Sequence, residues 1–203
     1  MLNNVNNYFV VFKTKIVNCV INTQVPSSKY SNKLTMKKIF FLSLFAFFAI
    51  NAKSQCTTCT INITGIDTVS YTVLTGQTLC IDTTGLITGT VILNGGTICN
   101  KGVFKPSSFT YTSGSINNQG NMTINSDITM TTGSSLDNSI TGIIALMGNI
   151  TLSGTTINNI GILNISQNIQ FNSGTFINDN IINVNLINGS GTINNTGTIN
   201  TNN

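Results

Sequence analysis

Residues 114–133 read GSINNQGNMTINSDITMTTG and contain a short word, Ile-Asn-Asn followed by glycine two residues later, that returns further along the chain. It occurs as Ile116–Gly120, Ile157–Gly161 and Ile193–Gly197. Between the words, apolar residues alternate with polar ones, as at Met122 and Ile124. A period of about 20 residues with alternation at every second residue indicates a repeat built from β-strands.

Four weaker words extend the repeat from Leu79 to the last strong word. Aligned with the three above, they are Leu79-Cys80-Ile81, Ile98-Cys99-Asn100, Leu136-Asp137-Asn138 and Ile177-Asn178-Asp179. The first residues of the seven words are spaced by 19, 18, 20, 21, 20 and 16. Each unit offers about three short strands separated by Gly, Asn and Ser turns, and no segment shows a helical stripe.

Strands this short cannot bury their inner faces unless successive units stack. We therefore predict an all-β fold, a single-stranded parallel β-helix (solenoid) of about 20-residue coils. The coils are expected over residues 76–203, incomplete at the C-terminal end, with an N-terminal cap segment over residues 55–75. A leucine-rich repeat is excluded because leucine is scarce and no unit has a helical half. Disorder is disfavoured by the regular Ile and Leu residues.

The asparagines of the words are predicted to form a ladder. Coils stacked about 4.8 Å apart place equivalent amides one above another, where each can donate and accept. The predicted rungs are Asn100, Asn118, Asn138, Asn159 and Asn195. The glycines that follow (Gly102, Gly120, Gly161 and Gly197) are expected to supply corners with positive φ. Ligand binding by these asparagines is the less favoured interpretation.

Composition limits the function. The chain has no His, Arg, Glu or Trp, so it lacks the commonest general base and metal ligand and the cation best suited to clamp phosphates. From Gln55 onward, two lysines oppose five aspartates, a net charge of −3. Nucleic-acid binding is excluded by this balance. No cofactor, metal site or catalytic residue is predicted.

Residues 36–54 read as a secretory signal peptide. Met36-Lys37-Lys38 precedes the apolar run Ile39–Ile50, and small residues then favour cleavage before Gln55. The run is short for a membrane span, so we expect a secreted or outer cell-surface protein with no membrane insertion after cleavage. An uncleaved anchor helix is the alternative. Residues 1–35 match no pattern and are interpreted as a disordered, non-native upstream extension.

Four cysteines follow the leader: Cys56, Cys59, Cys80 and Cys99. Behind a signal peptide they favour disulfides over zinc. Cys80 and Cys99 occupy one column in adjacent coils, so the first expectation pairs them and joins Cys56 to Cys59. The alternative ties the N-terminal pair to the column and clamps a cap onto the first coil. A redox role for the Cys-x-x-Cys segment is a weaker third interpretation, because no thioredoxin-like pattern surrounds it.

Two surface patterns have a functional and a simpler interpretation. Asp137 and Asp179 are expected in adjacent columns two coils apart, where paired carboxylates could hydrolyse a sugar bond, but solvated loop aspartates explain them more simply. An exposed threonine face, comprising Thr110, Thr112, Thr129, Thr131 and Thr151, has a spacing suited to ice binding. Exposed strands favour threonine in any case.

The leader, the Cys-rich start and the coils together resemble the large secreted β-helix and adhesin-like proteins of gliding, Bacteroidetes-type bacteria. The words Cys99–Gly102 and Ile116–Gly120 carry the resemblance, which covers Cys56–Asn203. Longer members of that family end in a sorting domain for type IX secretion, which is missing here, so the resemblance implies a truncated chain. It also implies O-glycans at Asp67-Thr68-Val69 and Asp82-Thr83-Thr84.

Three functions follow as expectations. The first is a non-enzymatic secreted or cell-surface structural, adhesin-like module with an unidentified surface or carbohydrate partner. The second is the N-terminal coils of a polysaccharide-active enzyme whose site lies beyond Asn203, and the third is ice binding. An uncovered last coil would also promote end-to-end self-association.

Overall fold

The structure, a computed structural model, describes residues 58–202. The predicted leader over 36–54, the segment 1–35 and Cys56 lie outside the described residues. The described part contains strands and no helix, and no segment of residues 58–202 forms a helix long and apolar enough to cross a membrane.

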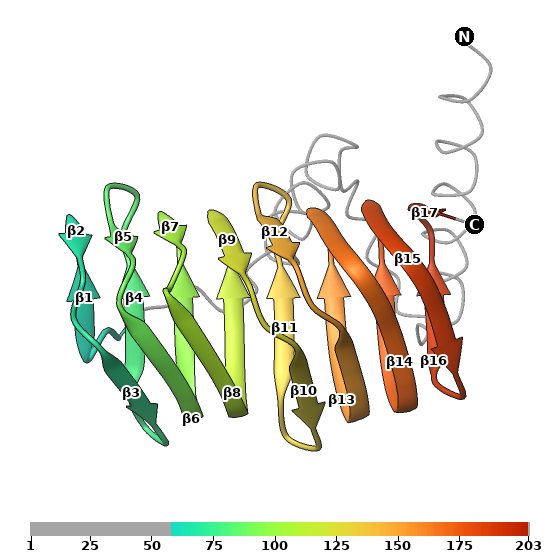
Figure 1. Cartoon of the computed structure of the whole chain (residues 1–203), viewed down its shortest axis with the longest axis horizontal. Coiled ribbons are helices and arrows are strands. Elements are labelled where there is room, and N and C mark those ends of the chain that lie inside the picture. The colour runs from blue at the N-terminus through green and yellow to red at the C-terminus, as the bar shows by residue number, and fades with distance from the viewer. Residues whose placement is uncertain (1–57, 203) are drawn as a thin grey trace, which may run out of the picture. The chain divides into compact units, whose positions relative to one another are not determined.

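Within residues 58–202, seventeen strands form one continuous sheet in which every pairing is parallel (Figure 1). The first nine are β1 (Ile61–Ile63), β2 (Ile66–Asp67), β3 (Tyr71–Leu74), β4 (Thr78–Ile81), β5 (Leu86–Ile87), β6 (Thr90–Asn100), β7 (Val103–Phe104), β8 (Ser108–Asn118) and β9 (Asn121–Ile124). The other eight are β10 (Ile128–Thr131), β11 (Ser135–Asn138), β12 (Ile143–Leu146), β13 (Ile150–Asn159), β14 (Ile162–Asn178), β15 (Ile181–Gly189), β16 (Thr192–Asn195) and β17 (Thr198–Thr201). The predicted parallel β-helix is confirmed.

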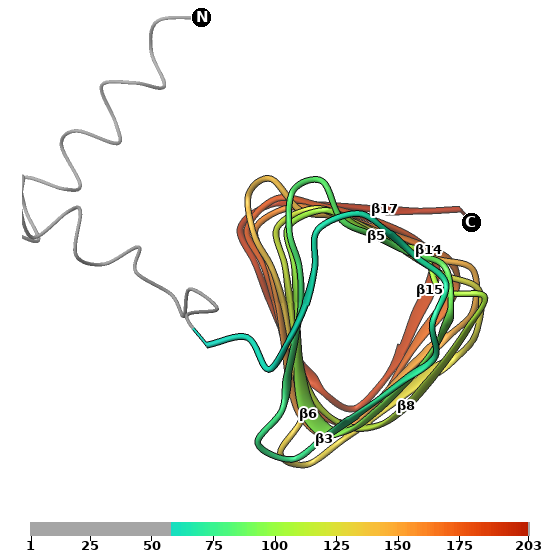
Figure 2. The ribbon, with the colours of Figure 1, turned by 90° about the vertical axis from the view of Figure 1, so that its left-hand side faces the viewer.

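Each coil has three faces, so the described part is roughly triangular when viewed along its axis (Figure 2). Face A carries the asparagine words and comprises residues 61–63, 78–81, 97–100, 115–118, 135–138, 156–159, 175–178 and 192–195. Face B comprises residues 66–67, 86–87, 103–104, 121–124, 143–146, 162–165, 181–184 and 198–201. Face C comprises residues 71–74, 90–94, 108–113, 128–131, 150–153, 168–171 and 186–189.

Register partners on face A lie 17 to 21 residues apart, which confirms the predicted coil length. One word was aligned wrongly. Ile157 pairs with Phe176 and Asn159 with Asn178, so the true word is Phe176-Ile177-Asn178. The spacings there are 19 and 17 instead of 20 and 16. The error arose because phenylalanine replaces the usual Ile or Leu, while Ile177 next to it matched the pattern one residue late.

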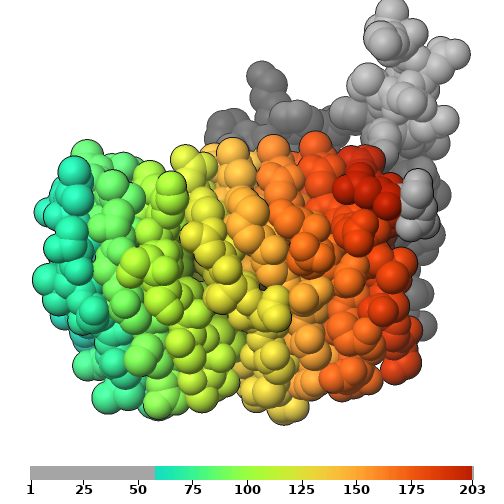
Figure 3. Space-filling view, viewed as in Figure 1, coloured from blue at the N-terminus to red at the C-terminus, as the bar shows by residue number. Residues whose placement is uncertain are grey.

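The solenoid also starts earlier than the predicted boundary at residue 76. Strands β1, β2 and β3 already pair with β4, β5 and β6 and so form a first coil within the segment expected to be a cap. This coil was missed because its words lack the Asn-Asn pair. Successive coils then follow one another as adjacent bands along the molecule (Figure 3).

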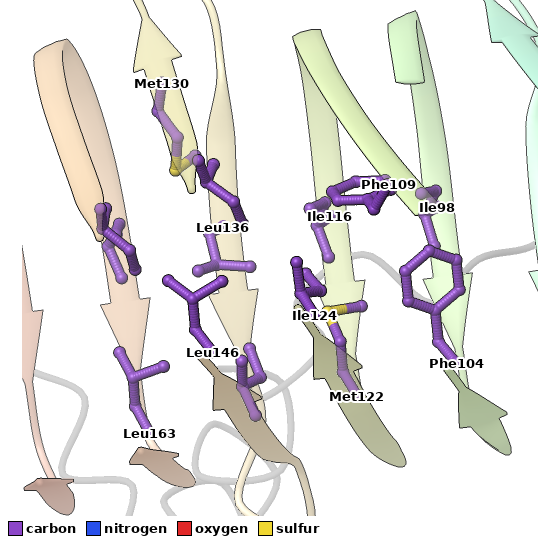
Figure 4. Close-up of a cluster of buried hydrophobic side chains, with 14 of the residues drawn as sticks. Ile98, Phe104, Phe109, Ile116, Met122, Ile124, Met130, Leu136, Leu146 and Leu163 are labelled. Atoms are coloured by element: carbon purple, nitrogen blue, oxygen red, sulfur yellow. The ribbon is translucent and has the colours of Figure 1, made fainter. Parts of the chain in front are cut away.

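The interior is filled by aliphatic columns, one side chain per coil, to which aromatic and methionine residues are added. On face A, Leu79, Ile98 and Ile116 are at most 1% exposed. The rings of Phe104 and Phe109 meet edge to face, with centroids 5.3 Å apart. Figure 4 shows side chains of neighbouring coils pointing toward one another in this core. Burial of these columns supplies the main stabilisation, at about 25 cal/mol per Å² of apolar surface.

Glycines shape two corners in different ways. At the corner between faces C and A, glycines adopt positive φ in successive coils, namely Gly76, Gly95, Gly114, Gly133, Gly154, Gly174 and Gly189. The glycines after the asparagines do not, and the predicted positive φ at Gly102, Gly120, Gly161 and Gly197 is therefore wrong. At Gly120, for example, a side chain would overlap the backbone of Gly102 and Lys101 in the coil before. Close stacking of backbones, and not a left-handed turn, requires glycine there.

Candidate functional site

The asparagine ladder runs inside face A, next to the corner with face B. The Nδ2 atom of each asparagine donates to Oδ1 of the next one. The five bonds are Asn100 to Asn118 (2.7 Å), Asn118 to Asn138 (2.9 Å), Asn138 to Asn159 (2.8 Å), Asn159 to Asn178 (2.8 Å) and Asn178 to Asn195 (2.7 Å). The predicted ladder is confirmed, with Asn178 as the rung that the misaligned word omitted.

Backbone carbonyls use the remaining donor capacity of the ladder. Asn159 Nδ2 also lies 3.1 Å from the carbonyl oxygen of Gly161 and 3.0 Å from that of Ile181 in the next coil. The inner rungs from Asn100 to Asn178 are at most 1% exposed. These amides are therefore bonded within the protein and sealed from solvent, which makes the ladder a structural element and not a binding surface.

The first rung is incomplete. Asn100 pairs in register with Ile81, which has no amide, and Oδ1 of Asn100 is buried without a hydrogen-bond partner. A buried acceptor in this state costs about 1–3 kcal/mol. The ladder therefore begins in the third coil, because Ile63 and Ile81 occupy this column in the two coils before it.

A second, shorter amide ladder lies on the outer side of face B. Asn183 donates to Asn164 and Asn200 donates to Asn183, both at 2.7 Å. These side chains are half-buried or exposed. Their donors point toward the earlier coil, opposite to the inner ladder, so the direction of an amide column is set by its surroundings and not by the fold as a whole.

The cysteines pair differently from the first expectation. Cys59 is bonded to Cys80, with Cα atoms 5.6 Å apart, and Cys99 is also disulfide-bonded. The expected bridges between Cys80 and Cys99 and between Cys56 and Cys59 are therefore wrong. Cys80 and Cys99 are register partners on parallel strands. Their Cβ atoms project side by side at the strand spacing of about 4.8 Å. That is wider than the Cβ separation of about 3.5–4.5 Å that a disulfide accepts.

The observed bridge corresponds to the alternative in which the N-terminal cysteines bind the column. Cys80 and Cys99 are 6% and 2% exposed although they project outward from face A. A small depression beside the bridge is lined by Cys59, Asn62, Cys80, Ile81, Asp82, Cys99 and Lys101. No group of three or more potential metal-binding side chains occurs among residues 58–202.

The aspartates are separated and bonded to their own surroundings. Asp67 accepts from Val69 N and Tyr71 Oη, Asp82 from Thr83 N, Asp127 from Asn149 N and Nδ2, Asp137 from Asn158 Nδ2, and Asp179 from Thr196 Oγ1. The expected placement of Asp137 and Asp179 in adjacent columns is wrong, because the column of Asp137 continues through Asn158 to Ile177. Asp179 lies two residues further along the chain.

Two tyrosines have raised pKa values for different reasons. The hydrogen bond that Tyr71 donates to Asp67 (2.7 Å) raises the pKa of the Tyr71 phenol, and burial and the negative charge of Asp67 add to the effect. Burial raises the pKa of Tyr111, whose hydroxyl donates to the carbonyl oxygen of Gly114 at 2.7 Å. Both hydroxyls therefore stay neutral and act as structural donors near pH 7.

The predicted threonine face is only partly continuous. Thr129 pairs with Thr151 and Thr131 with Ser153 on face C, as expected. Thr110 and Thr112 lie on β8, which has no register partner in β10, so the four exposed threonines of these two strands do not form one ladder. On the other side of β8, Tyr111 pairs with Leu93 of β6, so this part of face C is in register with the preceding coil only.

A more regular row of hydroxyls lies on the outer side of face A, and sequence reasoning missed it. The residue before each face-A anchor is Thr or Ser, and seven of these residues are register partners from coil to coil: Thr78, Thr97, Ser115, Ser135, Thr156, Thr175 and Thr192. Thr60 precedes them and bonds to Thr78 through backbone and hydroxyl. We call these eight residues the hydroxyl row. The signal was present one residue before each aligned word.

The hydroxyl row is half-buried to exposed, and its backbone register has no bulge. Ser135 donates to Ser115 at 3.1 Å. The buried asparagine ladder lies on the same strands, three residues further on, and holds their separation constant. Face A therefore presents a straight, uncharged row of hydroxyls, interrupted by no titratable side chain within the row itself.

Comparison with known proteins adds no relative. No family model, no curated protein and no solved structure matches the chain. The geometry of the described residues is accordingly the basis for the function discussed below.

Proposed function

We propose that the protein is a secreted or cell-surface structural module of adhesin-like type, without enzymatic activity, that presents the outer faces of the solenoid to a surface or carbohydrate partner. The observation that carries the proposal is the ladder of asparagines inside face A beneath the hydroxyl row. This arrangement stiffens the stacked coils and places a row of short, uncharged hydroxyls on the outer side of face A, beside a second outward column that contains Cys80, Cys99 and Asp137. Such a surface suits extended contact with many weak bonds.

The separation of the aspartates supports a non-enzymatic role over polysaccharide hydrolysis. Glycoside hydrolysis uses two carboxyl groups about 5–9.5 Å apart, one of which has a raised pKa. Here Asp67 and Asp137 have Ile87 and Asn158 as register partners, and neither partner is acidic. The competing proposal, that these are the first coils of a polysaccharide-active enzyme, places the catalytic groups outside residues 58–202.

One experiment separates these roles. The full chain is incubated with neutral and acidic polysaccharides and with intact bacterial cells, and both retention on the material and release of reducing sugar ends are measured. Retention without sugar release is the expected result. Sugar release above that of a variant lacking all five aspartates would contradict the proposal. Immunolabelling of unpermeabilised producing cells tests the surface location.

A matched pair of variants tests which face binds. Thr156→Lys with Thr175→Lys places two cations in the hydroxyl row, whereas Thr129→Lys with Thr131→Lys places them on face C. The first pair is expected to reduce retention and the second to leave it unchanged. Equal effects of both pairs would exclude face A as the contact surface.

Ice binding is a second candidate, and the hydroxyl row is the specific observation that favours it. Rungs of a parallel solenoid repeat at about 4.8 Å, which is close to a lattice spacing of ice, and the row has a hydroxyl in each of its eight coils. This row replaces the discontinuous threonines of face C as the candidate ice-binding surface. Thermal hysteresis and ice shaping by the purified protein, lost in Thr156→Lys with Thr175→Lys, test the idea. Absence of both effects in the unmodified protein would end it.

A further inference from the structure

We propose that the Cys56–Cys59 segment forms a two-point covalent clamp, in which Cys59 bonds to Cys80 and Cys56 bonds to Cys99, so that each cysteine of the segment holds a different coil. This inference does not depend on the proposed adhesin-like role, because it uses only the cysteines and the predicted leader.

The cysteines of the described part account for one complete bridge and half of another. Cys59 and Cys80 are bonded to each other, and Cys99 is disulfide-bonded as well. No further cysteine occurs among residues 58–202, so the partner of Cys99 is either Cys19 or Cys56.

Chain reach favours Cys56. Cys99 is the register partner of Cys80 on the next strand, about 4.8 Å away. Cys56 precedes Cys59 by three residues, which span at most about 10 Å when extended. A segment anchored at Cys59 over Cys80 thus reaches Cys99 without strain. Cys19 is 40 residues before Cys59 and precedes the predicted leader, so a processed chain would not contain it.

The positions of Cys80 and Cys99 explain why each can bond to a different cysteine of a segment that crosses face A. Cys80 and Cys99 project in the same direction from parallel strands, too far apart at Cβ to bond to each other. A segment that lies across the outer side of face A can meet both in turn. Cys80 and Cys99 project outward but are only 6% and 2% exposed, which agrees with a crossing segment packed over them.

The chemistry requires an oxidising partner. Each bridge forms when two thiols lose two protons and two electrons to the disulfide of a thiol–disulfide exchange protein, which is released as a dithiol. Two bridges consume two such disulfides. The clamp therefore forms where dithiol oxidases act, which agrees with export of the chain.

Peptide mapping tests the proposal directly on the full chain purified without reductant. Cleavage after lysine and before aspartate separates the cysteines into peptides 54–66 (Cys56 and Cys59), 67–81 (Cys80) and 82–101 (Cys99). The proposal predicts that all three peptides are joined in one species, which reduction resolves into three. Linkage of peptide 82–101 to peptide 16–29, which contains Cys19, would overturn it, as would a free thiol at Cys56.

Two double variants exclude the exchanged pairing. Cys56→Ser with Cys99→Ser should leave one bridge between peptides 54–66 and 67–81, and Cys59→Ser with Cys80→Ser should leave one between 54–66 and 82–101. Both should contain no free thiol after Cys56. Free thiols in both variants would indicate that Cys56 bonds to Cys80 and Cys59 to Cys99, and would refute the clamp as proposed. If the variants fail to fold, the three-peptide species in the unmodified protein still decides whether both coils are held.

Discussion

Asn118 donates its side-chain amide to Oδ1 of Asn138 at 2.9 Å, although 20 residues of chain separate them. We expect Asn138→Leu to lower the free energy of unfolding by about 1–3 kcal/mol, because leucine can neither accept from Asn118 nor donate to Asn159. Urea denaturation followed by circular dichroism measures the loss. The matched control is Asn183→Leu in the outer ladder, where water can replace the lost bonds. A loss as large in the control would show that the buried ladder has no special energetic role.

The glycine corner next to the ladder gives a second prediction. Gly120→Ala should destabilise the protein by about 1–3 kcal/mol, because the new methyl group meets the backbone of Gly102 and Lys101. Gly65→Ala is the control, since no atom lies within 4 Å of a side chain added there and its φ is ordinary. That change should be neutral or stabilise by up to about 1 kcal/mol. Thermal melting of the two variants side by side decides whether crowding, and not glycine content, governs this corner.

The disulfide between Cys59 and Cys80 in the first coils gives a third prediction. Replacing Cys59 and Cys80 by serine opens a loop with a sequence separation of 21. The expected loss is about 3 kcal/mol of unfolding free energy. Equilibrium denaturation of the variant and of the unmodified protein with and without reductant provides the comparison. An unmodified protein whose stability does not respond to reductant would contradict the prediction.

Stability should also fall at alkaline pH. Burial raises the pKa of Tyr111 in the folded state above its ordinary value of about 10. The neutral phenol is thus favoured by folding, and this contribution is fully present below about pH 10 and is lost as the pH rises through the higher folded value. Denaturation between pH 8 and 12, roughly spanning that range, should show the decline.

Tyr111→Phe is the control for this pH dependence. It removes the titrating hydroxyl together with its bond to Gly114, so the variant should be less stable near neutral pH and lose less stability on the alkaline side. Tyr71→Phe should have the smaller effect, since that ring is more exposed and its raised pKa comes mainly from Asp67. An unchanged alkaline decline in Tyr111→Phe would assign the effect elsewhere.

For a chain of these 203 residues, association through the coil of β16 and β17 is a fifth prediction. Among the described residues, β16 and β17 have pairing partners on one side only, and Ile193 in the core column is 40% exposed. We expect concentration-dependent association in light scattering, which Ile193→Lys should suppress because a cation is costly at a packed strand edge. Ile140→Lys is the control. Ile140 is 77% exposed but lies in a loop away from this edge. A protein that stays monomeric at all concentrations would refute the prediction.

Much of the fold could be predicted from the sequence, because residues that stack in a column of a parallel solenoid recur at a nearly fixed spacing along the chain. Isoleucine and asparagine recur in the words, so the coil length and the ladder were predictable. Phe176 broke the alignment because an aromatic side chain fills a column otherwise held by aliphatic ones, which only the packed core reveals. The role of Gly120 was mistaken because contact with another coil's backbone leaves no mark in local sequence.

The candidate surface was less predictable than the core. Threonines on face C were visible as Thr-x-Thr motifs, but the break in pairing between β8 and β10 depends on how successive coils align, which no local pattern shows. The hydroxyl row on face A has one residue per coil and so resembles ordinary strand composition. Disulfide pairing was open because it depends on the separation and direction of Cβ atoms, which register alone does not specify.

The inner amide column has a consequence for how such a molecule can change in length. From Asn100 to Asn178 every side-chain amide donates in the same direction along the axis. The column therefore has two different ends: Asn100, whose Oδ1 has no hydrogen-bond partner, and Asn195, which accepts the last bond. Inserting one more unit in the middle adds a bond while the two ends remain as they were. Duplication or deletion of whole units therefore leaves the free energy of the two column ends nearly unchanged. An insertion of a few residues would instead turn the following amides away from their neighbours.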